Sequence, residues 1–274
     1  MAKRTFALFL LVVFLVGAAG AASFRQVVRR LRDVKPPPGM VLVPAGNFWM
    51  GRNPDPDPNS DIHVGARPLR EISLPSFFVD VHEVTVADYR PCLDAGRCMR
   101  PATGPDCIFW APGFDEHPVN CVKLQDAVAY CAFVGKRVPT EAEWEKAARG
   151  VDGRGYPWGD EFDPAYGNFA DGGAVDGFVK TAPVGSFPQG RSPYGVEDMA
   201  GNLWEWTTTR KKTFYDPDRP DVLGEQYAGE SRIIKGGAFT VKRPFLARAS
   251  AVDWSRQTRH SLDLGFRCIK PTWP

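Results

Sequence analysis

The sequence predicts an α+β domain with little regular secondary structure, and three observations support this. The chain contains 27 glycines and 25 prolines, which favour turns over long helices. Eight tryptophans and 18 phenylalanines within a 43% hydrophobic composition are enough to build a sizeable core. Finally, only three stretches show the periodicity and capping signals of a helix.

The first 22 residues have the pattern of an export signal. Lys3 and Arg4 precede an apolar run over residues 6–16, and small residues follow over residues 17–22, as in a cleavable signal peptide. We expect cleavage near Ala22. The alternative is an uncleaved membrane anchor, for which about 17 apolar residues is at the short limit. Residues 23–38 are basic and end in three prolines, which predicts a linker, and the domain is expected to span residues 39–274.

Charge and cysteine content restrict the possible partners and the compartment. Without Lys3 and Arg4 the formal charge falls from +2 to zero, so nothing in the composition favours a nucleic-acid partner. Membrane contact is expected only through an uncleaved N-terminal segment. An even number of cysteines behind an export signal favours disulfides in a periplasmic or extracellular protein. The six are Cys92, Cys98, Cys107, Cys121, Cys131 and Cys268.

The chain up to residue 84 predicts short strands. Residues 40–43 and 48–51 are apolar and are separated by a Pro-Ala-Gly turn. Three prolines within residues 53–61 exclude regular structure there and predict an exposed loop. Residues 69–84 alternate apolar and polar side chains, which predicts a pair of strands.

Three helices are predicted between residues 85 and 150. Thr85 caps a short helix that runs to about Ala95 and is ended by Gly96. Residues 124–134 carry an apolar face, and a glycine follows them. Thr140 and Glu143 form a capping box that begins the third helix, which ends at Gly150. After residue 150 we expect loops and short strands.

An ordered series of motifs carries a resemblance to a known family. The motifs extend from about residue 39 to the C-terminus, and their residues are Val41-Pro44-Ala45-Gly46 with Met50-Gly51, Glu83-Val84-Thr85, His117-Pro118-Val119-Asn120, residues 135–145 (GKRVPTEAEWE), Tyr156-Pro157-Trp158-Gly159, residues 198–206 (DMAGNLWEW), Lys235-Gly236-Gly237 and Leu264-Gly265-Phe266-Arg267-Cys268. The series resembles the formylglycine-generating enzyme (sulfatase-modifying factor) family. This resemblance implies a C-type-lectin-like α+β fold stabilised by disulfides and calcium.

The resemblance implies two calcium sites. Calcium accepts carboxylate, amide and backbone carbonyl oxygens, and the positions that match the family's ligands offer these atoms. The first set is Asn168, Phe169, Asp176 and Phe178, and the second is Asp198, Gly201, Leu203 and Glu205. The alternative for Asn168 and Asp176 is that they only form turns.

The same resemblance shows what the chain lacks. The family's oxidases hold copper(I) between two cysteines that follow a Gly-Gly-Ser segment, and a soft metal of this kind needs soft sulfur ligands. Val241 and Leu246 occupy the two matching positions, and Ala238 replaces the serine. We therefore expect no copper and no oxidation of a substrate cysteine by the family's route.

The disulfide pattern is partly implied by the family. Cys131 and Cys268 match a family disulfide, while a second family disulfide falls on Ala148 and Ala251, so both of its partners are missing. The four additional cysteines (Cys92, Cys98, Cys107 and Cys121) are expected to form two bridges, and the sequence leaves three pairings open.

Other catalytic and binding patterns are weaker. His63, His82, His117 and His260 are scattered and lack metalloprotease spacing, although distant histidines could converge on an iron site. Four tryptophans could line a carbohydrate or peptide groove, but core packing is the favoured role; they are Trp144, Trp158, Trp204 and Trp206.

These observations lead to three functional hypotheses. The favoured one is an exported, calcium-stabilised binding or accessory protein with a protein, peptide or glycan ligand, and the charged segment of residues 207–232 is its first candidate surface. The alternative is an enzyme of different chemistry on the same scaffold, resembling either the pyoverdine-maturation branch or an iron-dependent oxidoreductase. A sulfatase-modifying oxidase is the least favoured hypothesis, because Val241 and Leu246 cannot bind copper.

Overall fold

The computed structural model describes residues 35–52, 68–170, 175–211 and 230–272. The chain divides into residues 1–36 and a compact unit over residues 37–274. The predicted export signal, most of the basic linker, the loop of residues 53–61 and His63 lie outside the described residues, so these predictions stay untested. Within the described ranges, no helix has the length and apolar character needed to cross a bilayer.

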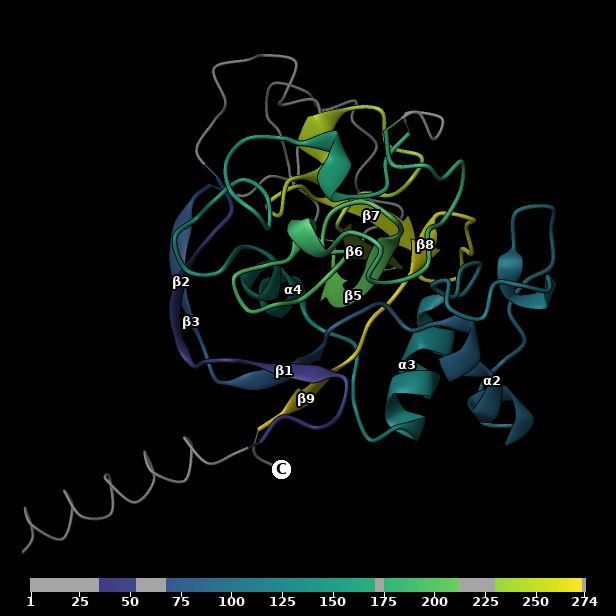
Figure 1. Cartoon of the computed structure of the whole chain (residues 1–274). Helices are drawn as coiled ribbons and strands as arrows, with labels where there is room; N and C mark the ends of the chain where they lie inside the picture. Colours follow the sequence, from purple (N-terminus) through teal and green to yellow (C-terminus); the bar gives the residue numbers. More distant parts are fainter. Residues whose placement is uncertain (1–34, 53–67, 171–174, 212–229, 273–274) are drawn as a thin grey trace, which may run out of the picture. The chain divides into compact units, whose positions relative to one another are not determined.

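The strands of the compact unit form three small sheets (Figure 1). The strand orders are β1-β4-β9, β2-β3 and β7-β6-β5-β8, and the pairs are antiparallel except for β5 with β8. The strands are β1 (Met40–Val43), β2 (Gly46–Met50), β3 (Arg70–Leu74), β4 (Phe77–Asp80), β5 (Trp204–Arg210), β6 (Ser231–Lys235), β7 (Asp253–Arg256), β8 (Leu264–Gly265) and β9 (Ile269–Pro271).

The predicted strand pair over residues 69–84 is only partly correct. Both strands exist, as β3 and β4, but they do not pair with each other: β3 pairs with β2, and β4 pairs with β1 and β9. The burial pattern gives the reason. All four residues of β4 are buried, whereas β3 has no fully buried residue. A strand buried on both faces needs a neighbour on each side, so β4 takes the centre of one sheet and β3 the edge of another.

The three predicted helices are confirmed. They are α2 (Val86–Asp94), α3 (Leu124–Phe133) and α4 (Glu141–Arg149). The Thr140 hydroxyl accepts from the Glu143 backbone N–H, and the Glu143 carboxylate accepts from the Thr140 N–H at 2.9 Å, which is the predicted capping box. Past residue 150 the described chain forms only strands and short 3₁₀ turns, which are η2 (Pro164–Tyr166), η3 (Pro188–Gly190) and η5 (Pro244–Ala247). One further 3₁₀ turn, η1 (Ile108–Trp110), lies between α2 and α3.

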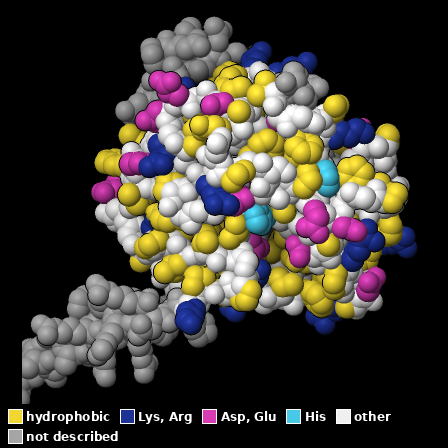
Figure 2. Space-filling view, in the orientation of Figure 1, with side chains coloured by type: hydrophobic (Ala, Val, Ile, Leu, Met, Phe, Trp, Pro, Cys, Tyr) yellow, Lys and Arg dark blue, Asp and Glu magenta, His cyan; other side chains and the backbone are white. Residues whose placement is uncertain are grey.

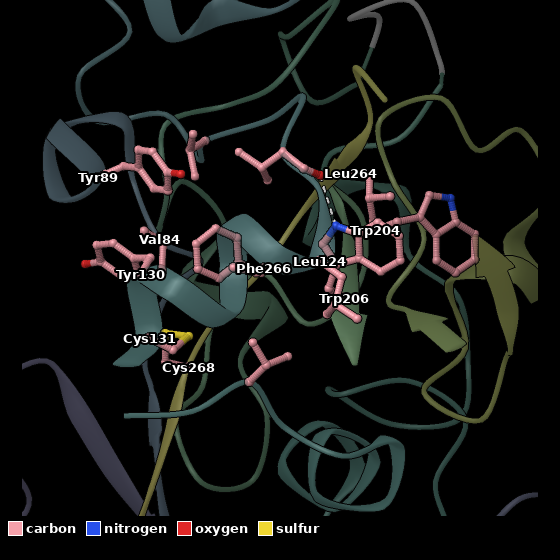
Figure 3. Packing of buried hydrophobic residues seen from close by; sticks show 14 of the residues in the cluster. Val84, Tyr89, Leu124, Tyr130, Cys131, Trp204, Trp206, Leu264, Phe266 and Cys268 are labelled. Atoms are coloured by element: carbon pink, nitrogen blue, oxygen red, sulfur yellow. Dashed lines mark hydrogen bonds between the residues drawn. A yellow bond between two sulfur atoms is a disulfide. The ribbon is translucent and has the colours of Figure 1, made fainter. Parts of the chain in front are cut away.

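Aromatic side chains fill the largest core cluster (Figure 3). Tyr89 from α2 stacks on Tyr130 from α3 with ring centroids 5.6 Å apart, and Phe266 meets Tyr130 edge to face at 5.6 Å. The indole of the buried Trp206 donates to the carbonyl of Val122 at 3.1 Å. Trp144 and Trp204 are also buried, whereas Trp158 is only half-buried and stacks on a neighbouring tyrosine. The core role predicted for the tryptophans is therefore confirmed for three of the four.

Three disulfides use all six cysteines of the chain. Cys131 on α3 is bridged to Cys268, the residue before β9, across a separation of 137 residues. The open pairing is resolved as Cys92–Cys98 and Cys107–Cys121. The Cys131–Cys268 bridge joins the C-terminal strand β9 to helix α3. The other two bridges fix the chain between α2 and α3.

Candidate functional site

The first predicted calcium position contains a buried oxygen without a hydrogen-bond donor. Asn168 is fully buried, and its Nδ2 donates to the Lys180 carbonyl at 2.7 Å and to Asn202 Oδ1 at 3.2 Å. Because Asn202 Oδ1 accepts from the Ala182 N–H at 3.0 Å, the orientation of the Asn168 amide is fixed by its neighbours. Its Oδ1 then has no hydrogen-bond partner. A buried acceptor in this state requires a cation or a water, and it is the oxygen that the sequence assigns to calcium.

The other members of this set lie beside one another. Asp176 Oδ2 accepts from the Phe169 N–H at 2.9 Å, and Asp176 Oδ1 accepts from the Phe178 N–H at 2.7 Å. The carboxylate thus joins the two residues whose carbonyls were assigned to the ion, and Phe169 follows Asn168 directly in the chain. The contact between Asp176 and the Phe178 N–H is also a turn of the kind predicted as the alternative role of Asp176. One loop therefore holds all four predicted ligands.

The second predicted position adjoins the first. Gly201 packs so closely on Asn168 that a Cβ atom at Gly201 would lie 2.5 Å from the Asn168 backbone oxygen. The Asn202 N–H donates to that same oxygen at 2.9 Å. Asp198 has a left-handed backbone with φ of 57° and accepts from the Gly185 N–H at 2.7 Å. Burial raises the pKa of the Asp198 carboxyl to about 6.

Glu205, the remaining carboxylate of the second set, is occupied by protein donors. Its oxygens accept from Arg267 Nε at 2.8 and 2.9 Å and from Arg267 Nη2 at 2.7 Å. The Trp144 indole donates to Glu205 Oε2 at 2.8 Å. Both members of the ion pair are fully buried. The carboxylate predicted as a calcium ligand is thus also the partner of Arg267, a contact that sequence reasoning missed.

Glu83 is a further acidic residue of this centre that sequence reasoning missed. Its carboxylate accepts from Asn202 Nδ2 at 2.8 Å and from the Leu203 N–H at 3.2 Å. Burial, followed by the nearby negative charges of Asp198 and Glu205, raises the pKa of Glu83 well above its ordinary value. Glu83 does belong to one of the ordered motifs, which was the available signal, but no pattern around it indicated a role.

The charges of this centre do not balance. Three buried carboxylates, those of Glu83, Asp198 and Glu205, face one buried guanidinium, that of Arg267. Burying unpaired carboxylates is costly unless they take up protons or a cation. In the described ranges, no group of three His, Cys, Asp or Glu side chains has the geometry to hold one ion. A cation here would depend on amide and backbone oxygens as well, which calcium accepts.

The position of the family's copper site is apolar. Val241 and Ala238 are buried within the large core cluster, and Leu246 is partly buried against the same cluster. Among the cysteines none is free, because the three disulfides use all six. Neither Val241 nor Leu246 can supply a thiolate.

Two of the three described histidines, His82 and His117, have separate partners. His82 Nε2 lies 3.2 Å from Glu197 Oε2, and His117 Nδ1 lies 3.0 Å from the Thr181 hydroxyl. Burial lowers the pKa of His117. Together with the result for ion-holding groups above, these contacts give no support to a histidine-based iron site in the described part of the chain.

Fold and site together define a disulfide-linked α+β domain whose loops converge on a buried acidic centre around one arginine. The profile of the sulfatase-modifying factor enzyme 1-like domain matches residues 25–272. The chain therefore belongs to the formylglycine-generating enzyme (sulfatase-modifying factor) family, as its motifs predicted, and the predicted α+β fold with disulfides is confirmed.

Relatives in this family differ in their named activities. A formylglycine-generating enzyme of Bos taurus is 31% identical over 291 residues, which cover 87% of this chain and 76% of the relative. An inactive C-alpha-formylglycine-generating enzyme 2 of Mus musculus is 32% identical over 281 residues, covering 84% and 85%. The solved structure of PvdO from Pseudomonas aeruginosa has a TM-score of 0.68 and 27% identity, covering 85% of this chain and 94% of that chain.

Proposed function

We infer that this protein is an exported binding or accessory domain of the family that does not carry out cysteine oxidation. The supporting observation is the apolar side chains of Val241 and Leu246 at the positions where the oxidases have their two thiolates. Copper(I) requires soft ligands, and every sulfhydryl group that could substitute is consumed in a disulfide. The ligand is a protein, a peptide or a glycan. A relative whose name describes it as inactive supports the absence of oxidation in this proposal.

The oxidase hypothesis has a direct test. The exported, disulfide-bonded protein is supplied with copper(I) and a peptide that carries the sulfatase motif, and aldehyde is measured by mass spectrometry. We expect neither copper binding nor aldehyde. The double variant Val241→Cys/Leu246→Cys is expected to bind one copper ion, because it restores the thiolate pair on the same backbone. Aldehyde formed by the unaltered protein would contradict the proposal.

Calcium is the metal that the residues fit. The orphaned Oδ1 of Asn168 fits a hard cation, and a cation is one of two ways, with protonation, to balance the buried carboxylates near Arg267. Asn168, Asp176 and the carbonyls of Phe169 and Phe178 would hold one ion. Asp198 with the carbonyls of Gly201 and Leu203 would contribute to a second. Calcium would supply no chemistry here, only fixation of loops that lack regular structure.

Calcium binding is expected to raise the melting temperature. At a calcium concentration 100 times the Kd, one bound ion stabilises the fold by about 2.7 kcal/mol, which corresponds to roughly 5–10 °C for a domain of this size. Differential scanning calorimetry with calcium and with a chelator measures the shift. Titration calorimetry is expected to count two ions for the native chain and one for Asn168→Ala.

A matched control separates binding from general destabilisation. Asn120 is also a buried amide, and it bonds the Ile108 N–H and the carbonyls of Asp106 and Leu262, but it belongs to neither predicted site. Asn120→Ala is expected to melt at a lower temperature and still respond to calcium in full. An unchanged ion count in Asn168→Ala, or no response in the native protein, would contradict the assignment.

The second candidate function is an enzyme of different chemistry on the same scaffold. The similarity to PvdO is the reason to consider this function. Metal analysis of protein purified from its natural host distinguishes such an enzyme from a binding domain. A stoichiometric transition metal or a tightly bound organic molecule would support the enzyme. Calcium alone would support the binding domain.

The proposed compartment is outside the cytoplasm. Three disulfides are typical of a secreted or lumenal protein, and the first 22 residues have the composition of an export signal. N-terminal sequencing of the mature protein would show cleavage near Ala22 or retention of the segment as an anchor.

A further inference from the structure

Three side chains form an exposed surface beside α2, which we call the platform: Met99, Arg100 and Trp110. Met99 is 59% exposed and Trp110 is 43% exposed. The guanidinium carbon of Arg100 lies 4.5 Å from the centroid of the Trp110 ring, and the indole N–H donates to the Pro101 carbonyl at 3.3 Å. In Figure 1 the chain after α2 runs along the outer edge of the domain, opposite β2 and β3.

Two disulfides and a hydrogen bond from the core fix the backbone of the platform. Disulfides Cys92–Cys98 and Cys107–Cys121 bracket its two chain segments. The Tyr89 hydroxyl, from the core, donates to the Met99 carbonyl at 2.9 Å. A surface fixed in advance loses little conformational entropy when a partner binds.

The turn η1 separates inward from outward aromatic side chains. Phe109 is buried and meets Tyr89 edge to face at 5.7 Å, while the next residue, Trp110, faces solvent. An exposed tryptophan with a neighbouring methionine and arginine is a combination enriched in protein interfaces. Packing within the described part of the chain accounts for the position of Phe109 but leaves the side chains of Met99 and Trp110 exposed.

The charges around the platform favour an acidic partner. Asp106 is neutralised by Lys180 at 2.6 Å. The guanidinium groups of Arg97 and Arg100 form no ion pair with any residue in the described part of the chain, and one further acid, Asp94, lies between residues 90 and 105. Figure 2 shows one face of the domain, on which both acidic and basic side chains lie. Complementarity at the platform is therefore with negative charge.

We propose that the platform binds a short segment of another protein in which acidic residues flank an apolar side chain. The apolar residue packs on Met99 and the Trp110 ring, and the acidic residues pair with Arg97 and Arg100. The inference rests on the binding role proposed above, but the two fail separately, since calcium and copper are measured at residues outside the platform.

The probe is a displayed library of random twelve-residue peptides, selected against the full exported protein with its disulfides intact. Enriched peptides are expected to contain an aromatic or aliphatic residue flanked by Asp or Glu. Their synthetic versions are expected to lose at least about tenfold in affinity against Trp110→Ala and against Arg100→Ala. Arg100 is exposed and lies outside the core, so Arg100→Ala keeps the test valid even where Trp110→Ala disturbs folding.

A second exposed tryptophan provides the matched control. Trp254 is 40% exposed, and Lys211 Nζ lies 3.5 Å from its ring centroid, so it repeats the cation-over-indole arrangement elsewhere on the domain. Trp254→Ala is expected to bind the selected peptides with unchanged affinity. Loss of affinity in this variant would mean that the peptides recognise exposed indoles in general, and it would overturn the proposal.

Three other outcomes also overturn it. Enriched peptides without an acidic bias would show that Arg97 and Arg100 do not select the partner. A failure to enrich any peptide over the Trp110→Ala protein would show that the platform is not a binding site. Binding of heparin that depends on Arg97 and Arg100, without peptide enrichment, would make the platform a site for sulfated glycans. Sedimentation in which Trp110→Ala dissociates a dimer would make a second copy of this chain the occupant.

Discussion

The double variant Cys131→Ala/Cys268→Ala is expected to lose about 5 kcal/mol of unfolding free energy. The bridge joins residues 137 positions apart, and the entropy it removes from the unfolded chain increases with the length of the closed loop. Both sulfur atoms lie inside the core beside Tyr130 and Phe266 (Figure 3), so the substitution also removes packing. Urea unfolding followed by tryptophan fluorescence measures the difference.

The Cys92–Cys98 bridge provides the comparison. Its separation is 6 residues, for which the same chain-entropy relation gives about 2 kcal/mol. Cys92→Ala/Cys98→Ala is therefore expected to cost less than half as much. Equal losses in the two variants would show that strain or residual structure, and not loop closure, determines the contribution of these bridges.

Replacing Arg267 is expected to be the most damaging single substitution in the acidic centre. Arg267→Leu leaves the Glu205 carboxylate buried without its ion pair and removes the positive charge near Glu83 and Asp198. Breaking one side of a buried pair typically costs about 3–5 kcal/mol. Denaturant unfolding in the presence of calcium measures the loss, so that any bound ion is retained.

Two variants test this explanation. Arg90 pairs with Asp115 at the surface, where both side chains are largely exposed, so Arg90→Leu is expected to cost less than about 1 kcal/mol. In the centre, the double variant Glu205→Leu/Arg267→Leu is expected to be less destabilised than the sum of its single variants. Additive losses would mean that the two residues contribute independently and that the ion pair is not the cause.

The sequence predicted the fold best where the determining residues are neighbours in the chain. The capping box of Thr140 and Glu143 spans four residues, and the helix begins where that pattern places it. Strand pairing was harder to predict from the sequence, because the partners of β4 are set by its burial between β1 and β9. The residues of β9 lie almost 200 positions from β4, and no local pattern encodes that contact.

In the candidate site, too, the contacts between residues distant in the chain were the ones that the sequence did not predict. The family resemblance identified Asn168 and Asp176, and the structure places them near the residues whose carbonyls were predicted for calcium. The pairing of Glu205 with Arg267, 62 residues later, and the contact of Glu83 with Asn202 at a separation of 119 residues were not predicted. Each of these carboxylates has a role set by partners that only tertiary folding brings near.

The position of Cys268 has a consequence for biosynthesis. It lies 137 residues after Cys131, so the thiol of Cys131 has no correct partner until all the residues between them have been synthesised. Four other cysteines become available earlier, and six thiols allow 15 sets of three bridges. Mispaired intermediates then have to be rearranged by thiol exchange. Correct folding of this protein is thus expected to depend on a disulfide isomerase, and yields of folded protein should fall in a host that lacks one.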